Sequence, residues 1–129
     1  MLRSPDTGSA RMTLDDYNAF CAALPATTHV VQWGGAHVWK VGGKVFAIAG
    51  WSAGPALAVT FKCAPQSFDI LKDLPGLRPA PYLASRGMSW IQRTGDGSMD
   101  DEALAAYVAE SHRLVAAGLT RKARAALGL

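Results

Sequence analysis

The sequence predicts an α+β fold of two layers, in which helices pack on one face of an antiparallel sheet of about five strands. Three observations favour it: a helical apolar stripe near the start, short β-rich runs separated by glycine pairs, and a longer helical stripe near the end. A chain of 129 residues, half of them apolar, suits one globular domain. We therefore expect a single domain over 12–129, preceded by a flexible polar tail over 1–11.

The first helix is expected from Thr13 to Leu24, because Thr13 can cap it and Pro25 stops it. The clearest local signal follows at 38–48, where Gly42-Gly43 separates two β-rich runs. Two glycines suit a two-residue hairpin turn, which needs positive φ. The predicted register pairs Trp39 with Phe46 and Lys40 with Val45, and it places Ile48 on the Trp39 face and Ala47 on the opposite face.

The remaining elements follow from alternation and helix signals. A strand over 56–62 points Leu57, Val59 and Phe61 one way and Lys62 the other. We expect a short helix over 65–71, a last strand over 88–93, and a long helix over 100–117 with an acidic first turn. Thr120 then caps a short basic helix, whereas the proline-rich segment 75–81 cannot form a central strand.

Composition limits the function. The charge sum is 13 − 10 = +3, which permits an anionic partner without requiring one. Cys21 and Cys63 lie in apolar surroundings and are expected to be buried reduced thiols, which fits a cytoplasmic bacterial protein. No apolar run approaches the ~20 residues of a membrane span, so we expect no membrane association. We also expect a monomer.

The sequence contains no recognisable catalytic or metal motif. None of His29, His37 and His112 has a second histidine four residues away, and there is no Cys-x-x-Cys pair. Gly42-Gly43-Lys44 precedes a strand, whereas a phosphate-binding loop opens onto a helix. We therefore expect no enzyme activity, no metal and no cofactor.

A basic surface is the remaining candidate site. Cations hold phosphates and aromatic rings stack on bases, so cations interleaved with aromatic residues are typical of a nucleic-acid surface. Any soluble sheet also keeps cations on its wet face, and tryptophans more often belong to a core, as we expect for Trp39. The candidate contact residues are Lys40, Lys62, Tyr82, Arg86, Trp90, Arg93, Arg121 and Lys122.

Several segments, in order and spacing, resemble the MmcQ/YjbR family of small bacterial domains. They are Lys-Val-Gly-Gly-Lys-Val-Phe at 40–46, Phe61-Lys-Cys63, Arg78-Pro-Ala-Pro-Tyr82, Trp90 and Ser111-His-Arg-Leu-Val115. The resemblance covers about residues 13–126. It implies a compact fold similar to the CyaY-like and secretion-chaperone-like folds, and a predicted DNA-binding role.

Two further function classes remain open. A protein-interaction adaptor is suggested by the chaperone-like resemblance and by Trp51, which lies in a Gly/Pro loop as an exposed anchor. A small-molecule or iron-binding role ranks third, because the long helix carries few acids and several alanines. Our first hypothesis is a non-enzymatic DNA-binding domain.

Overall fold

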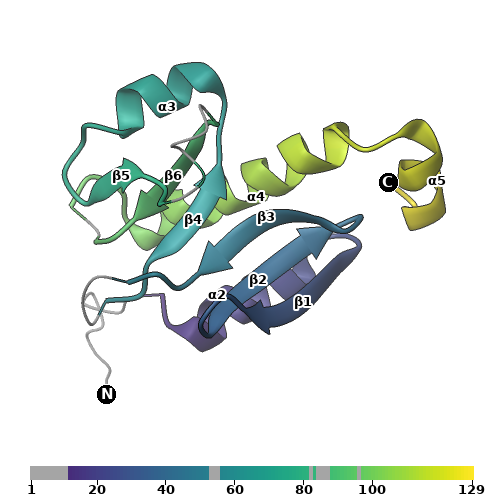
Figure 1. Ribbon diagram of the computed structural model, residues 1–129, viewed down its shortest axis with the longest axis horizontal. Helices are drawn as coiled ribbons and strands as arrows, with labels where there is room; N and C mark the ends of the chain where they lie inside the picture. The colour runs from purple at the N-terminus through teal and green to yellow at the C-terminus, as the bar shows by residue number, and fades with distance from the viewer. Residues whose placement is uncertain (1–11, 53–55, 82, 84–87, 96) are drawn as a thin grey trace.

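The computed structural model describes residues 12–52, 56–81, 83, 88–95 and 97–129 (Figure 1). The described strands form one six-stranded antiparallel sheet of order β1-β2-β3-β4-β6-β5, so the α+β prediction is confirmed. The predicted tail over 1–11 lies outside the described residues. In chain order the elements are α2 (Leu14–Ala23), β1 (Thr27–Gln32), β2 (Ala36–Val41), β3 (Lys44–Ala49), β4 (Val59–Lys62), α3 (Pro65–Leu71), β5 (Leu77–Pro79), β6 (Trp90–Arg93), α4 (Asp101–Ala117) and α5 (Arg121–Leu127).

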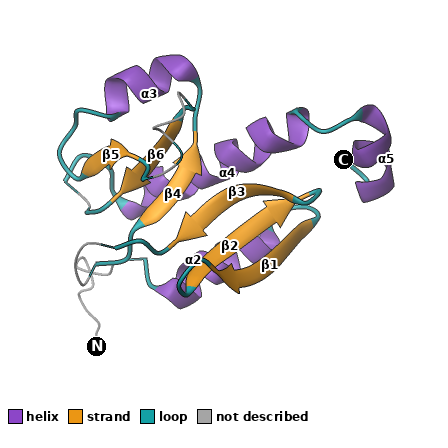
Figure 2. Cartoon of the chain, viewed as in Figure 1, coloured by secondary structure: helices purple, strands orange, loops and turns teal. Residues whose placement is uncertain are grey.

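The helices α2, α3 and α4 pack on one face of the sheet, as predicted, with α2 behind β1 and β2 and α4 passing behind β4 in Figure 2. One buried apolar cluster joins helices and sheet, and its largest members include Tyr17, Phe46, Phe61, Ile91 and Leu104. The sheet exceeds the expected five strands because the proline-rich segment contributes β5. It pairs only with β6, at an edge of the sheet, where a proline is tolerated.

The β2–β3 hairpin has the predicted two-residue turn, since φ is +58° at Gly42 and +78° at Gly43. Lys40 pairs with Val45 as predicted. A β-bulge then shifts the register, so Trp39 pairs with Ala47. The predicted Trp39–Phe46 pair is therefore wrong, because the bulge inserts one unpaired residue into β3.

The bulge also changes which β3 side chains face the helices. Phe46 and Ala47 both belong to the helix-side core, and Ala49 joins them. Ile48 instead packs with Val38 in a second cluster on the other face. The faces predicted for Ala47 and Ile48 were thus reversed.

The face away from the helices is partly covered. The Gln92 side chain, fully buried in β6, donates to the backbone oxygens of Gly50 and Trp51 at 3.3 and 3.2 Å. Its own oxygen accepts from Arg78 Nε at 2.6 Å. These bonds hold the segment after β3 across the centre of this face.

Candidate nucleic-acid interface

Two of the predicted contact residues, Lys40 and Lys62, lie on the sheet face away from the helices. Their strand neighbours Trp39 and Phe61 point into the helix-side core, so alternation turns both lysines outward. Ala47 pairs with both Trp39 and Phe61. The two lysines therefore lie on the same face of the sheet, on either side of β3.

Ser111 of α4 fixes the backbone beside Lys62. Its hydroxyl donates to the carbonyl oxygen of Phe46 at 2.7 Å and accepts from the amide of Lys62 at 2.8 Å. The described β3–β4 pairing runs only as far as Ala47 and Phe61, so Ser111 bridges the two strands where their ladder stops. Nothing local in the sequence indicated this bridging role for Ser111.

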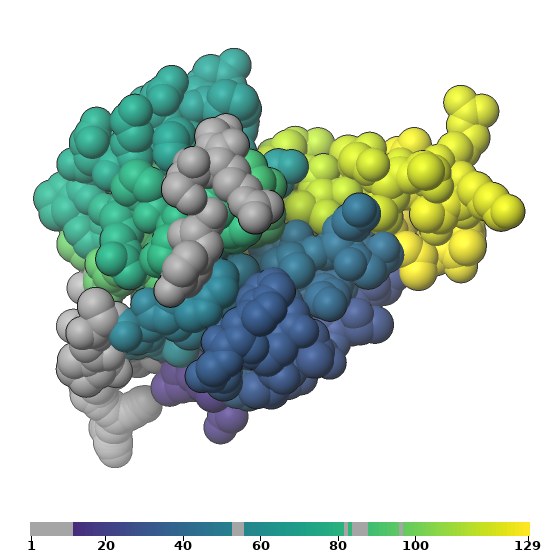
Figure 3. Space-filling model, viewed as in Figure 1, coloured from purple at the N-terminus to yellow at the C-terminus, as the bar shows by residue number. Residues whose placement is uncertain are grey.

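The tip of the β2–β3 hairpin contacts the segment that leads into α5. A Cβ atom on Gly42 would lie 2.6 Å from a methyl carbon of Leu119, which is itself buried. Lys44, the first residue of β3, is exposed at this tip. Arg121 and Lys122 are exposed at the start of α5. Figures 1 and 3 show α5 projecting at one end of the molecule.

Cations of the hairpin and of α5 thus lie at one end of the molecule, and Lys62 of β4 lies on the same sheet face as Lys40. We call this set the cationic end; its residues are Lys40, Lys44, Lys62, Arg121, Lys122 and Arg124. Lys44 and Arg124 were not among the predicted contacts. The predicted hairpin register could have identified Lys44 as a candidate contact, because a two-residue turn pairs Lys44 with Val41, the neighbour of Lys40.

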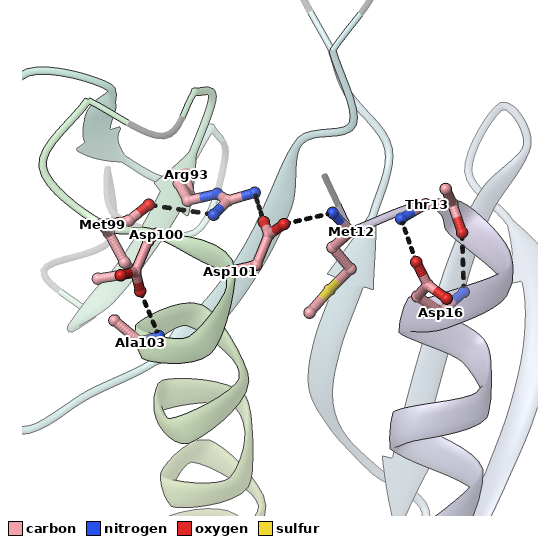
Figure 4. Close-up of polar contacts among 8 residues, drawn as sticks. All are labelled: Met12, Thr13, Asp16, Arg93, Met99, Asp100, Asp101 and Ala103. Atoms are coloured by element: carbon pink, nitrogen blue, oxygen red, sulfur yellow. Dashed lines mark hydrogen bonds and ion pairs between the residues drawn. The ribbon is translucent and has the colours of Figure 1, made fainter. Parts of the chain in front are cut away.

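The starts of α2 and α4 form an acidic region (Figure 4). They lie side by side, since the Met12 amide donates to Asp101 Oδ2 at 2.6 Å. Thr13 and Asp16 cap α2 reciprocally, and Asp100 caps α4. Hydrogen bonds from Thr13 lower the pKa of Asp16, which keeps its carboxyl ionised.

This acidic region lies far from the cationic end. The last turn of α2 is near the hairpin tip, because Thr27, which pairs with Val41, donates from its hydroxyl to the Cys21 carbonyl. Later in α4, the Nε2 of His112 contacts the carbonyl of Pro25 at 2.8 Å. Both helices therefore run from the acidic region toward the cationic end.

Trp90, which pairs with Lys62, and Arg93 are both buried, which corrects their prediction as contacts. They are only 5% and 4% exposed. In β6, Arg93 points to the helix side, where its guanidinium contacts Asp101 Oδ1 at 2.8 Å and donates to the Met99 carbonyl at 3.0 Å (Figure 4). The charge of Arg93 thus forms an ion pair that connects β6 with the start of α4. Tyr82 and Arg86 lie outside the described residues.

Two features of the described residues bear on metal and thiol chemistry. None of these residues group three or more histidine, cysteine or acidic side chains around a metal position. Burial raises the pKa of Cys21 to about 12 and that of Cys63 to about 11, the opposite of what a nucleophilic thiol needs. No helix in the described part of the chain is long and apolar enough to cross a membrane.

The YjbR family model matches residues 22–114, which is most of the chain. The chain belongs to the YjbR family. This YjbR-family chain is also similar to the crystal structure of Deinococcus radiodurans protein DR2400, which has a DUF419 domain. The two are 26% identical with a TM-score of 0.78, over 91% of this chain and 88% of the other. None of the curated proteins matches. The predicted family and fold are therefore confirmed.

Proposed function

We propose that this YjbR-family protein binds DNA through the cationic end and catalyses no reaction. The observation that carries the proposal is the separation of charge. Cations of the hairpin and of α5 lie at one end, with Lys62 on the same sheet face as Lys40, whereas the acids of the α2 and α4 starts lie away from that end. A net charge of only +3 therefore understates the positive field of that end.

The side chains at the cationic end favour contacts with phosphates over contacts with bases. Trp39 and Trp90 are buried, so neither offers a stacking platform. Trp33 and Trp51 stack loosely, with ring centroids 5.9 Å apart, and Trp33 lies at the β1–β2 turn, which is the opposite end of β2 from the hairpin tip. Lysine and arginine without base-reading partners hold the duplex backbone irrespective of sequence. We therefore expect double-stranded DNA of any sequence to bind better than single strands.

The test is the salt dependence of binding. Fluorescence anisotropy with a labelled duplex of mixed sequence, between ~50 and ~200 mM salt, gives the slope of log affinity against log salt. Each phosphate contact adds about one unit to that slope, so Lys40→Ala/Lys62→Ala should reduce it by about two. Arg121→Ala/Lys122→Ala should do the same.

Lys72→Ala is the control, because Lys72 directly follows α3, away from the hairpin tip and α5, and pairs with Asp69 at 3.4 Å. It removes one positive charge, half of what each double variant removes, and should leave the slope unchanged. Equal slopes for wild type and both double variants would remove the cationic end from the proposal. No binding at low salt would refute DNA binding altogether. Circular dichroism is the control that each variant is folded.

An adaptor role is the second candidate, favoured by one observation. Val31, in the edge strand β1, is 53% exposed, and Trp33, just after that strand, is 52% exposed. The predicted anchor, Trp51, is half-buried and stacks on Trp33, so Trp33 is the more exposed ring. Under this alternative, Trp33→Ala should abolish capture of a specific protein partner at any salt concentration. Equal recovery by wild type and variant would count against it.

A further inference from the structure

The two edges of the sheet differ in how they are protected against pairing with another strand. β5, at one edge, has three residues and contains Arg78 and Pro79. A short edge strand, a charged side chain and a proline are features by which natural sheets prevent such pairing. β1, at the other edge, has six residues and pairs with β2 in a regular register without a bulge (Figure 1). The β5 edge is therefore protected, whereas the β1 edge is not.

The β1 edge is uncharged and exposed. Residues 26–39 include no lysine, arginine, aspartate, glutamate or proline. Four consecutive residues of β1, from Thr28 to Val31, are exposed. Among the described residues, no strand pairs with the outer side of β1, so this edge presents backbone N–H and C=O groups in the geometry that an added strand needs. The chemistry of the edge therefore specifies an extended, uncharged strand as its partner.

β1 itself is such a strand, and its two faces show how a second copy would pair with it. Thr28 and Val30 lie on the face away from the helices, because they pair with Lys40 and Val38 of β2. By alternation, His29 and Val31 lie on the helix-side face, and both remain exposed although α2 packs against β1.

Symmetry restricts the register of two paired copies. A two-fold axis perpendicular to the sheet keeps the helices of both copies on one face, and opposite side chains in an antiparallel pair also share a face. Both conditions hold only when one residue lies opposite its own copy. With Val30 at that position, Thr28 lies opposite Gln32 of the second copy, and His29 lies opposite Val31. Each exposed valine is then covered by a neighbour from the other copy, and no charged side chain is buried.

We propose that two copies of this chain form a dimer by antiparallel pairing of their β1 strands, with Val30 opposite Val30 of the second copy. The two sheets then become one continuous sheet. The inference revises the expected monomer, because strand order, which places β1 at an edge, could not be read from the sequence. Lys40 and Lys62 lie outside the paired edge.

Sedimentation equilibrium of the full chain tests the proposal. We expect a dimer whose population rises with protein concentration up to ~1 mM. Val31→Lys places a cation at the exposed edge and should give a monomer. Ile70→Lys is the matched control, because Ile70 is 66% exposed, against 53% for Val31, and lies on α3, which packs near the opposite edge of the sheet. It should dimerise as wild type does.

A wild-type monomer at ~1 mM would overturn the proposal and leave the edge to a strand of another protein. A dimer that persists in Val31→Lys, or that is lost equally in Ile70→Lys, would overturn it as well. Val31 is exposed, so its substitution should leave the fold intact, which circular dichroism checks.

Disulfide crosslinking tests the register. Opposite residues in an antiparallel pair have Cα atoms about 4.5–5.5 Å apart, so Val30→Cys should form a covalent dimer when oxidised with diamide. Val31→Cys should crosslink far less, because its Cα would lie about 8 Å from its own copy. Wild type should not crosslink, since Cys21 and Cys63 are buried. Crosslinking of Val31→Cys but not of Val30→Cys would overturn this register. DNA binding by the cationic end does not depend on any of these results.

Discussion

Substituting Gly42 by alanine tests whether the hairpin tip is packed against the segment before α5. Gly42 and Gly43 both have positive φ, so alanine at either position costs about 1–2 kcal/mol of backbone strain. A Cβ at Gly43 meets nothing within 4 Å, whereas at Gly42 it would lie 2.6 and 2.9 Å from the two methyl carbons of Leu119. Overpacking costs about 1–3 kcal/mol, and the flexible Leu119 side chain places this contact near the lower limit. We therefore expect Gly42→Ala to destabilise the protein by about 1 kcal/mol more than Gly43→Ala.

Urea unfolding with a shared m-value measures this difference, because both variants change one glycine in the same turn. Leu119→Ala removes the clashing methyl groups, so the excess cost of Gly42→Ala should disappear in that background while the cost of Gly43→Ala stays unchanged. Equal destabilisation by the two glycine variants would show that the tip and Leu119 are not packed together. The gathering of Lys44 and Arg121 toward one end would then lose its structural support.

Two further predictions concern buried groups. Arg93→Met should destabilise the protein by about 3 kcal/mol, since it removes the ion-pair partner of Asp101, and the solvent contact of Asp101 keeps the cost at the low end of the range. The matched change Arg113→Met, in an exposed ion pair, should cost less than about 1 kcal/mol in the same urea experiment. Cys21 and Cys63, with raised pKa values of about 12 and 11, should react with a disulfide reagent at pH 8 only after denaturation. Rapid labelling of the native protein would contradict their burial.

The elements that the sequence predicted correctly are those with local causes. The Gly42-Gly43 turn needs positive φ, which glycine alone adopts readily. Thr13, Asp100 and Thr120 each accept a backbone hydrogen bond at a helix start, so the caps lie close to where short-range rules place them.

The incorrect predictions concern side chains whose position depends on residues distant in the sequence. The bulge reverses Ala47 and Ile48, and beside it the Phe46 carbonyl accepts a hydrogen bond from Ser111, 65 residues away. Arg93 was predicted as an exposed contact, but it lies on the same face of β6 as Ile91, and nothing local in the sequence says that helices cover that face. The partner of Arg93, Asp101, looked like an ordinary acidic helix start. A cation opposite a helix start in space has no local signature in the sequence.

The helix dipoles offer a structural explanation for part of the cationic end, and α5 shows where that explanation fails. The carboxyl ends of α2 and α4 point toward the cationic end, and their partial negative charge favours nearby cations in the folded protein. Arg121 and Lys122 instead lie at the amino end of α5, where each is disfavoured by about 0.3–1 kcal/mol at low salt. If Arg121 and Lys122 stabilise the fold, the variant Arg121→Ala/Lys122→Ala should lower the stability of the protein. If they bind an anionic partner instead, this variant should be at least as stable as wild type and should bind DNA more weakly. We expect the second result, because alanine also favours the helix. Loss of stability together with unchanged DNA affinity would refute the assignment of these two residues.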